Sequence, residues 1–294
     1  MRRIFLFILT NLAIMLMVTL IARVTGLDVW LAERGSNFGG LLLLAAIFGF
    51  GGAFISLAMS KWIAVRSMGV QIIEQPANER ERWLVETVRT LATRSGLGMP
   101  EVGIFDSPQP NAFATGPKRN AALVAVSSGL LAAMKPDEIE AVLGHEITHV
   151  ANGDMVTLTL IQGVLNTFVT AIAWIVGNIV DRSVLRNEEG RGIGYMLTVW
   201  ITQIVLGVLA TLIVLWFSRR REYRADWGGA HLTGREHMIA ALERLQRAHE
   251  EPLPSHMDAF AIAGRASGGL GRLLMSHPTI EERIAALRAA PDLS

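Results

Sequence analysis

Four long stretches without charged side chains stand out in the hydrophobic and polar pattern of this sequence. They cover about residues 4–22, 37–60, 155–180 and 195–217. A hydrocarbon core about 30 Å thick requires roughly 20 apolar residues in a helix that rises about 1.5 Å per residue. Each stretch is long enough for one crossing, so the pattern predicts four transmembrane helices.

Shorter amphipathic patterns fill the remaining segments, 61–154 and 218–294. Residues 78–95 carry apolar side chains at helical spacing, whereas residues 102–105 and 121–126 are brief apolar runs bounded by Pro, Asn, Gly and Ser. We therefore expect a mainly helical α+β domain with a small sheet. Two transmembrane helices in residues 1–60 precede its first part, and the hairpin 155–217 separates its two parts.

Composition and charge agree with a membrane protein. Hydrophobic residues make up 51% of the chain and charged residues only 18%, and the net charge of +1 argues against nucleic-acid binding. The positive-inside rule then predicts that both termini and the two domain segments face the cytoplasm. The basic residues that set this orientation are Arg2, Arg3, Lys61, Arg66 and Arg219–Arg221.

The segment His145-Glu146-Ile147-Thr148-His149 carries the candidate chemistry. Positions i and i+4 lie on one face of a helix, so His145 and His149 can direct ring nitrogens at one metal ion. Glu146 lies about a quarter-turn away, where a carboxylate can accept a proton from attacking water. Pro136 followed by two acidic residues predicts where this helix begins. The pattern indicates metal-assisted hydrolysis.

A hydrolytic zinc site of this kind needs a third protein ligand, for which Glu222 is the best candidate. An even number of crossings must separate it from His149, and the hairpin 155–217 supplies two. Glu222 follows the second crossing closely, although a Glu among arginines is commonly a surface carboxylate in an ion pair. Asp226, four residues further on, can accept a hydrogen bond from a ligating His.

The sequence resembles the HtpX family of bacterial membrane zinc metalloproteases, which are related to the prenyl-protein endopeptidases. The similarity covers essentially the whole chain and rests on several separate motifs. A Thr at position 279 departs from the Pro that the family often has there. The matching motifs are Asn111-Ala112-Phe113-Ala114-Thr115-Gly116, Gly144–His149 with Asn152-Gly153-Asp154, Arg221-Glu222-Tyr223-Arg224-Ala225-Asp226, and Ser276-His277-Pro278 with Arg283.

The resemblance implies one zinc ion per chain, bound by His145, His149 and Glu222, with Glu146 as general base. It also suggests that His277 donates a hydrogen bond to the oxyanion of the tetrahedral intermediate, although a single His before Pro is more often a loop or core residue. The expected fold is an α-helical integral membrane protein with four transmembrane helices and a zincin-type α+β metalloprotease domain. The expected location is the bacterial cell inner membrane.

The same resemblance implies that the protein is an endopeptidase that cleaves misfolded or damaged membrane and cytoplasmic proteins in a stress response. Its partners would be protein or peptide substrates and the lipid bilayer. A functional partnership with other membrane quality-control proteases is compatible with it, and no oligomeric state follows. Two alternatives stand beside this one: a processing protease of narrow specificity, and a non-catalytic metal-binding stress sensor, for which Glu146 would have no purpose.

Three further features have more than one interpretation. Arg283 is expected to be structural, pairing with Asp226, whereas Asn111 is either a turn residue or a substrate contact. The strand 121–126 is expected to be an edge strand that holds an extended peptide through backbone hydrogen bonds. The alternative is an ordinary strand that is paired within the sheet.

Overall fold

The computed structural model of the protein describes residues 38–186, 192–250, 275 and 277–291. Contacts divide the chain into two compact units, each built from two separate segments. The helical unit comprises Met1–Ile55 and Thr159–Ile213, and the sheet unit comprises Ser56–Leu158 and Val214–Ser294.

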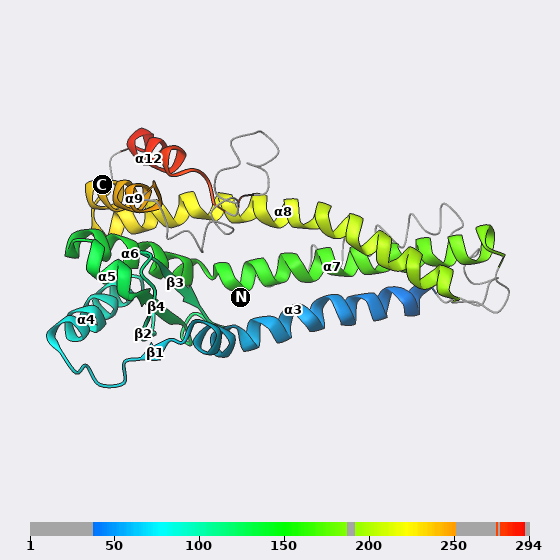
Figure 1. Ribbon diagram of the computed structural model, residues 1–294, viewed down its shortest axis with the longest axis horizontal. Helices are drawn as coiled ribbons and strands as arrows, with labels where there is room; N and C mark the ends of the chain where they lie inside the picture. The colour runs from blue at the N-terminus through cyan, green and yellow to red at the C-terminus, as the bar shows by residue number, and fades with distance from the viewer. Residues whose placement is uncertain (1–37, 187–191, 251–274, 276, 292–294) are drawn as a thin grey trace. The chain divides into compact units, whose positions relative to one another are not determined.

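Three long helices in the described part of the chain are apolar enough to cross a membrane: α3 (Phe38–Met68), α7 (Asp154–Ile179) and α8 (Ile193–Thr233) (Figure 1). A short π-helix, η1 (Val180–Val184), continues α7. These helices contain three of the four predicted spans. The remaining prediction, residues 4–22, lies outside the described residues, so the structure supports three candidate crossings.

Small residues bring α3 and α7 close together within the helical unit. A Cβ atom on Gly49 would lie 2.4 Å from the Thr167 hydroxyl oxygen, and one on Gly163 would lie 2.7 Å from the ring of Phe50. A side chain at position 49 would also meet the Thr167 backbone nitrogen at 2.6 Å, so the helices would have to shift, whereas at position 163 the Phe50 ring would have to move. Close approach through small residues is the usual way in which membrane helices pack.

Helix α8 is longer than the sequence pattern suggested. The span predicted over about residues 195–217 is only the first part of one helix of 41 residues, which continues to Thr233. The charged residues after the span are good helix formers, and charge alone does not interrupt a helix. Gly234 follows the last residue of the helix and has a positive φ of 107°.

The sheet unit is built on four strands in the order β1-β2-β4-β3. Strand β4 pairs in parallel with β2 and antiparallel with β3, while β1 pairs antiparallel with β2. The strands are β1 (Gln71–Ile72), β2 (Glu101–Phe105), β3 (Ala112–Thr115) and β4 (Leu123–Ser127).

This pairing shows that the edge-strand prediction was wrong. Residues 123–126 of this run lie in β4, an inner strand whose residues are all buried, and the edge strand beside it is β3. Alternate residues of β4 serve two faces: Val124 and Val126 join the main core, whereas Leu123 and Ala125 pack in a smaller cluster with Val70. Because β4 is buried on both faces, its sequence does not alternate between polar and apolar residues. The sequence therefore does not distinguish an inner strand from an edge strand.

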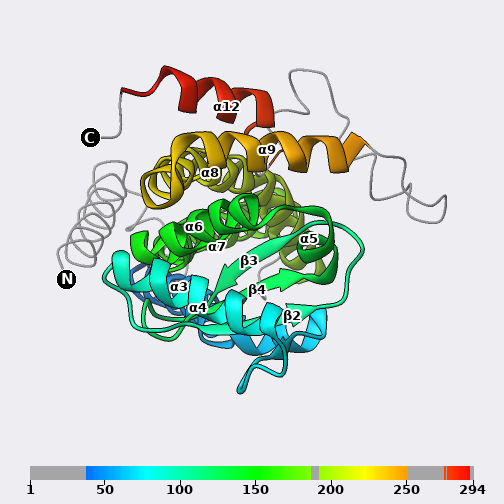
Figure 2. The same ribbon diagram turned by 90° about the vertical axis from the view of Figure 1, so that its left-hand side faces the viewer.

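Helices cover the main-core face of this sheet. Helix α6 (Pro136–Asn152) contacts β3 and β4, and α4 (Glu79–Arg94) contacts both β2 and α6. Helix α9 (Arg235–Glu250) packs on α6, and α12 (Ile280–Ala289) packs on α9 (Figure 2). The short helix α5 (Ser128–Ala133) follows β4 directly. Helix α6 therefore lies between the sheet and α9.

Local signals define both ends of α6. Pro136 occupies the first turn, where its missing N–H costs nothing, and the Glu138 carboxylate accepts a hydrogen bond of 2.9 Å from the Lys135 backbone N–H. Gly153 ends the helix in the left-handed conformation, with φ 65° and ψ 37°. Apolar residues such as Leu143 and Ile147 are fully buried, so this helix is held firmly in the core.

Candidate metal centre

Helix α6 presents His145 and His149 on one face, one turn apart. Both side chains are buried, and their Nε2 atoms lie 3.1 Å from each other. The two rings are perpendicular, with centroids 4.7 Å apart. The i, i+4 spacing therefore produces the convergence of ring nitrogens that the sequence predicts.

Glu222 of α8 completes this group. Its Oε1 atom lies 3.3 Å from the His149 Nε2 atom, and its Oε2 atom lies 3.5 Å from the His145 Nε2 atom. One ligand atom from each of the three residues lies within 4.8 Å of the other two. Both carboxylate oxygens are buried, and their polar neighbours are imidazole nitrogens that have no fixed positive charge, so burial of this anion is costly unless a cation is bound there. The donor set of two imidazole nitrogens and one carboxylate oxygen fits a divalent transition metal.

The Nδ1 atom of each imidazole, which points away from the cluster of three residues, contacts a buried carboxylate. The His145 Nδ1 atom lies 2.9 Å from Asp226 Oδ1, and the His149 Nδ1 atom lies 2.7 Å from Asp154 Oδ2. Such pairs favour a proton on Nδ1 and leave the Nε2 lone pair available for a metal. Asp226 lies where the sequence placed it, whereas sequence reasoning assigned no function to Asp154.

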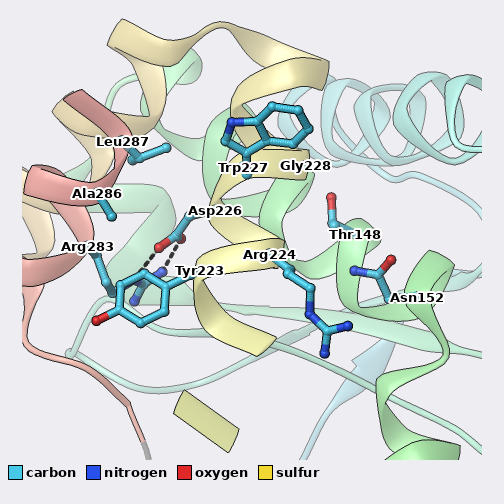
Figure 3. A pocket seen from close by; sticks show the side chains of 10 residues that line it. All are labelled: Thr148, Asn152, Tyr223, Arg224, Asp226, Trp227, Gly228, Arg283, Ala286 and Leu287. Atoms are coloured by element: carbon cyan, nitrogen blue, oxygen red, sulfur yellow. Dashed lines mark hydrogen bonds and ion pairs between the residues drawn. The ribbon is translucent and has the colours of Figure 1, made fainter. Parts of the chain in front are cut away.

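Arg283 of α12 binds the other side of Asp226. Its Nε atom donates to Asp226 Oδ2 at 2.7 Å, and a terminal nitrogen donates to Oδ1 (Figure 3). The pairing expected between Arg283 and Asp226 is therefore present. The pair lies in the wall of a groove of about 500 Å³ that also exposes Tyr223 and Trp227. Arg283 thus neutralises the carboxylate that orients His145 and connects α12 to α8.

Three candidate residues remain, and each lies in a different part of the chain. Glu146 is half-buried on α6 beside His145, and His277 has an exposed side chain whose Nδ1 atom lies 2.8 Å from Glu222 Oε2. Asn111 precedes β3, where its backbone N–H donates to the Ser127 hydroxyl oxygen at 2.9 Å and its side chain is exposed. The structure thus brings His277 to the ligand cluster and places Asn111 at the start of the edge strand.

Glycine residues allow α8 to approach α6 closely enough for these contacts. A Cβ atom on Gly229 would lie 2.9 Å from the His145 backbone nitrogen and 3.3 Å from the carbonyl carbon of Gly144. On Gly228 it would lie 2.3 Å from the Thr148 methyl carbon. Any side chain at these two positions would therefore separate the helices that carry the ligands.

Both imidazoles have raised pKa values in the metal-free protein. Burial lowers the pKa of His149, but the hydrogen bond to Asp154 and the negative charges of Glu222 and Glu146 outweigh it, raising the pKa to about 9. Burial also lowers the pKa of His145, and Asp226 and Glu222 again reverse the effect. Because a ligating imidazole must be neutral, metal uptake at neutral pH releases protons.

Comparison with known proteins decides the family. The model of peptidase family M48 matches residues 78–290, which include all the residues of this cluster. The chain belongs to peptidase family M48. Curated relatives place it more narrowly, among the HtpX proteases, which confirms the family resemblance noted in the sequence.

Two of these relatives align with this M48 peptidase over almost its full length. The protease HtpX homolog of Thiobacillus denitrificans is 60% identical over 289 residues, covering 98% of this chain and 99% of the relative. The protease HtpX of Thioalkalivibrio sulfidiphilus is 57% identical over 292 residues, with 98% and 99% covered. The protein is therefore a membrane metalloprotease, and the alternative of a non-catalytic metal-binding sensor is not supported.

The fold has also been seen in a solved structure. The crystal structure of S. mikatae Ste24p matches this M48 peptidase with a TM-score of 0.64 and 19% sequence identity. The match covers 92% of this chain but 64% of that one. At this level of identity the similarity concerns the fold alone, and it agrees with a multi-pass membrane protein.

Substitution of Gly229 by Ala tests whether helix spacing controls the metal centre. The new methyl group would press against the His145 backbone and move α8 away from α6. Overpacking of this kind costs about 1–3 kcal/mol, so we expect metal affinity to fall about tenfold or more in a chelator competition. Gly207→Ala is the matched control. Gly207 lies on the same helix, and a Cβ atom there would meet no neighbouring atom within 4 Å. Equal affinities for the two variants would refute the dependence on spacing.

Metal affinity should depend on pH between about 7 and 9. The metal-free protein holds the His149 proton below its pKa of about 9. A metal ion must displace that proton, and any proton that His145 also holds, so affinity should rise by at least about tenfold per pH unit as pH increases across this range. Calorimetry in two buffers of different ionisation enthalpy would count the released protons. An affinity that does not change from pH 7 to 9 would mean that His149 is already neutral without metal.

Proposed function

We propose that the protein is a zinc-dependent endopeptidase of the bacterial inner membrane whose metal centre is formed by His145, His149 and Glu222. The observation that carries this proposal is the convergence of one ligand atom from each residue within 4.8 Å in a buried site. Zinc is the metal best suited to a site with two His, one Glu and an open position. Bound there, it would act as a Lewis acid that polarises a substrate carbonyl and lowers the pKa of water to about 7.

Glu146 is proposed as the general base. It follows His145 directly on α6, is half-buried, and is close enough to His149 for its charge to raise that residue's pKa. A carboxylate in this position takes the proton from the attacking water and delivers it to the leaving amine. His277, whose ring already reaches Glu222, is proposed to donate a hydrogen bond to the oxyanion that develops on the substrate.

Strand β3 is the proposed binding site for the substrate backbone. It pairs with β4 on one side only, contacts α6, and lies at the end of the four-stranded order. An extended peptide can add to such an edge through main-chain hydrogen bonds that tolerate many side chains. We therefore assign to β3 the peptide-binding role that was expected of residues 121–126. Asn111 directly precedes this strand.

The cellular role is also a proposal. The distribution of basic residues supports a cytoplasmic orientation of both termini and of the active site. The full-length similarity to proteases named HtpX supports a role in the quality control of misfolded or damaged membrane and cytoplasmic proteins under stress. A backbone-binding edge strand suits such a broad range of substrates better than a single processing sequence.

Replacement of Glu146 by Gln separates catalysis from metal binding. The amide cannot accept the proton, so cleavage of unfolded casein should fall by about 10²–10⁴-fold, while the purified protein still binds one zinc ion. Glu140→Gln on the same helix is the control and should retain activity. If the Glu146→Gln protein cleaved casein at the normal rate, another residue would have to be the base.

Replacement of Glu222 by Gln tests the third ligand. Loss of the anionic oxygen from a buried site should reduce zinc affinity by about 10–100-fold or more in a chelator competition. Glu86→Gln, at an exposed position on α4, controls for the loss of one negative charge. An unchanged affinity in the Glu222→Gln protein would remove this residue from the metal centre.

A further inference from the structure

Asp154 is a buried carboxylate that lies outside the set of three ligands and the general base. The residue is 3% exposed, and its Oδ2 atom lies 2.7 Å from the Nδ1 atom of His149. It is also the first residue of α7, one of the helices long enough to cross the membrane. The same side chain therefore begins a membrane helix and contacts a metal-binding imidazole.

The local backbone explains how a residue so close in sequence reaches the ring. In a continuous α-helix, residue i+5 lies about 140° around the axis from residue i, so its side chain points away. Gly153 interrupts α6 with a left-handed conformation, φ 65° and ψ 37°, and the chain turns before α7 begins. The turn returns Asp154 to the side of His149. A residue with a Cβ would be strained in this conformation.

The contact gives His149 the same support that His145 receives from Asp226. In both rings a carboxylate accepts the Nδ1 proton, and the Nε2 atom faces Glu222. The two carboxylates differ in their own stabilisation. Asp226 is bound by Arg283, whereas Asp154 occupies the first turn of α7, where the helix dipole favours negative charge.

We propose that Asp154 is a positioning residue that fixes the orientation and tautomer of His149, and that it thereby makes the beginning of membrane helix α7 a part of the metal centre. The proposal rests on the proposed zinc function of His149. Its consequence is that both membrane helices next to the site contribute to metal binding. Helix α8 supplies Glu222 and Asp226, and α7 supplies Asp154.

Zinc affinity of the full-length protein, measured by chelator competition in detergent, tests this role. Asp154→Ala removes the acceptor, and we expect a loss of about 10–100-fold, the usual effect of removing a carboxylate that supports a ligating His. Asp154→Asn keeps the shape and one acceptor oxygen, so it should lose less. Asp137→Ala, which removes a first-turn acid from α6, should leave the affinity unchanged and controls for helix-end charge.

A second readout distinguishes positioning from a general loss of structure. In spectra of metal-free protein labelled with ¹⁵N-histidine and held at about pH 10, above the raised His149 pKa of about 9, the neutral ring in Asp154→Ala should show loss of the Nδ1–H form, while that in Asp154→Asn should retain it. If wild-type protein binds zinc but Asp154→Ala binds it equally well, the positioning role is wrong and the proposed function stands. If wild-type protein binds no zinc, the proposed function itself fails.

Discussion

The metal centre depends on the close approach of α6 and α8. Gly229 lies against the backbone of His145, and Gly228 lies against Thr148, at distances that leave no room for a side chain. Glu222 is seven residues before Gly229, two helical turns along the same face. The contact that brings the helix backbones together therefore also carries the carboxylate to the two imidazoles. Asp154 and Asp226 support the two rings, and Arg283 neutralises a negative charge that this approach buries.

The order of the ligands along the chain means that a bound metal would connect distant segments. Two ligands precede the membrane hairpin and the third follows it, yet all three belong to the sheet unit. A bound metal would therefore connect the two segments from which this unit is built, and its binding free energy would add to the stability of their association. Arg283 extends the connection to α12 through Asp226.

Much of this site could be predicted from the sequence because the decisive signals are local or topological. The spacing of His145 and His149 requires only helix geometry, and Glu222 follows from the need to return to the same side of a membrane. Asp154 was missed because its contact depends on a left-handed turn at Gly153, which the sequence permits but does not require. The edge strand was misassigned because strand order is set by pairing between distant segments. The unbroken α8 was missed because a change from apolar to charged residues resembles a helix boundary without being one.

Metal coordination is the central claim, and X-ray absorption spectroscopy at the zinc edge of the loaded, full-length protein tests it most directly. We predict two imidazole nitrogens at about 2.0–2.1 Å and carboxylate or water oxygens at about 2.0–2.2 Å, with one zinc ion per chain. A spectrum that requires one imidazole or none, or a zinc content far below one ion per chain, would contradict the site formed by His145, His149 and Glu222.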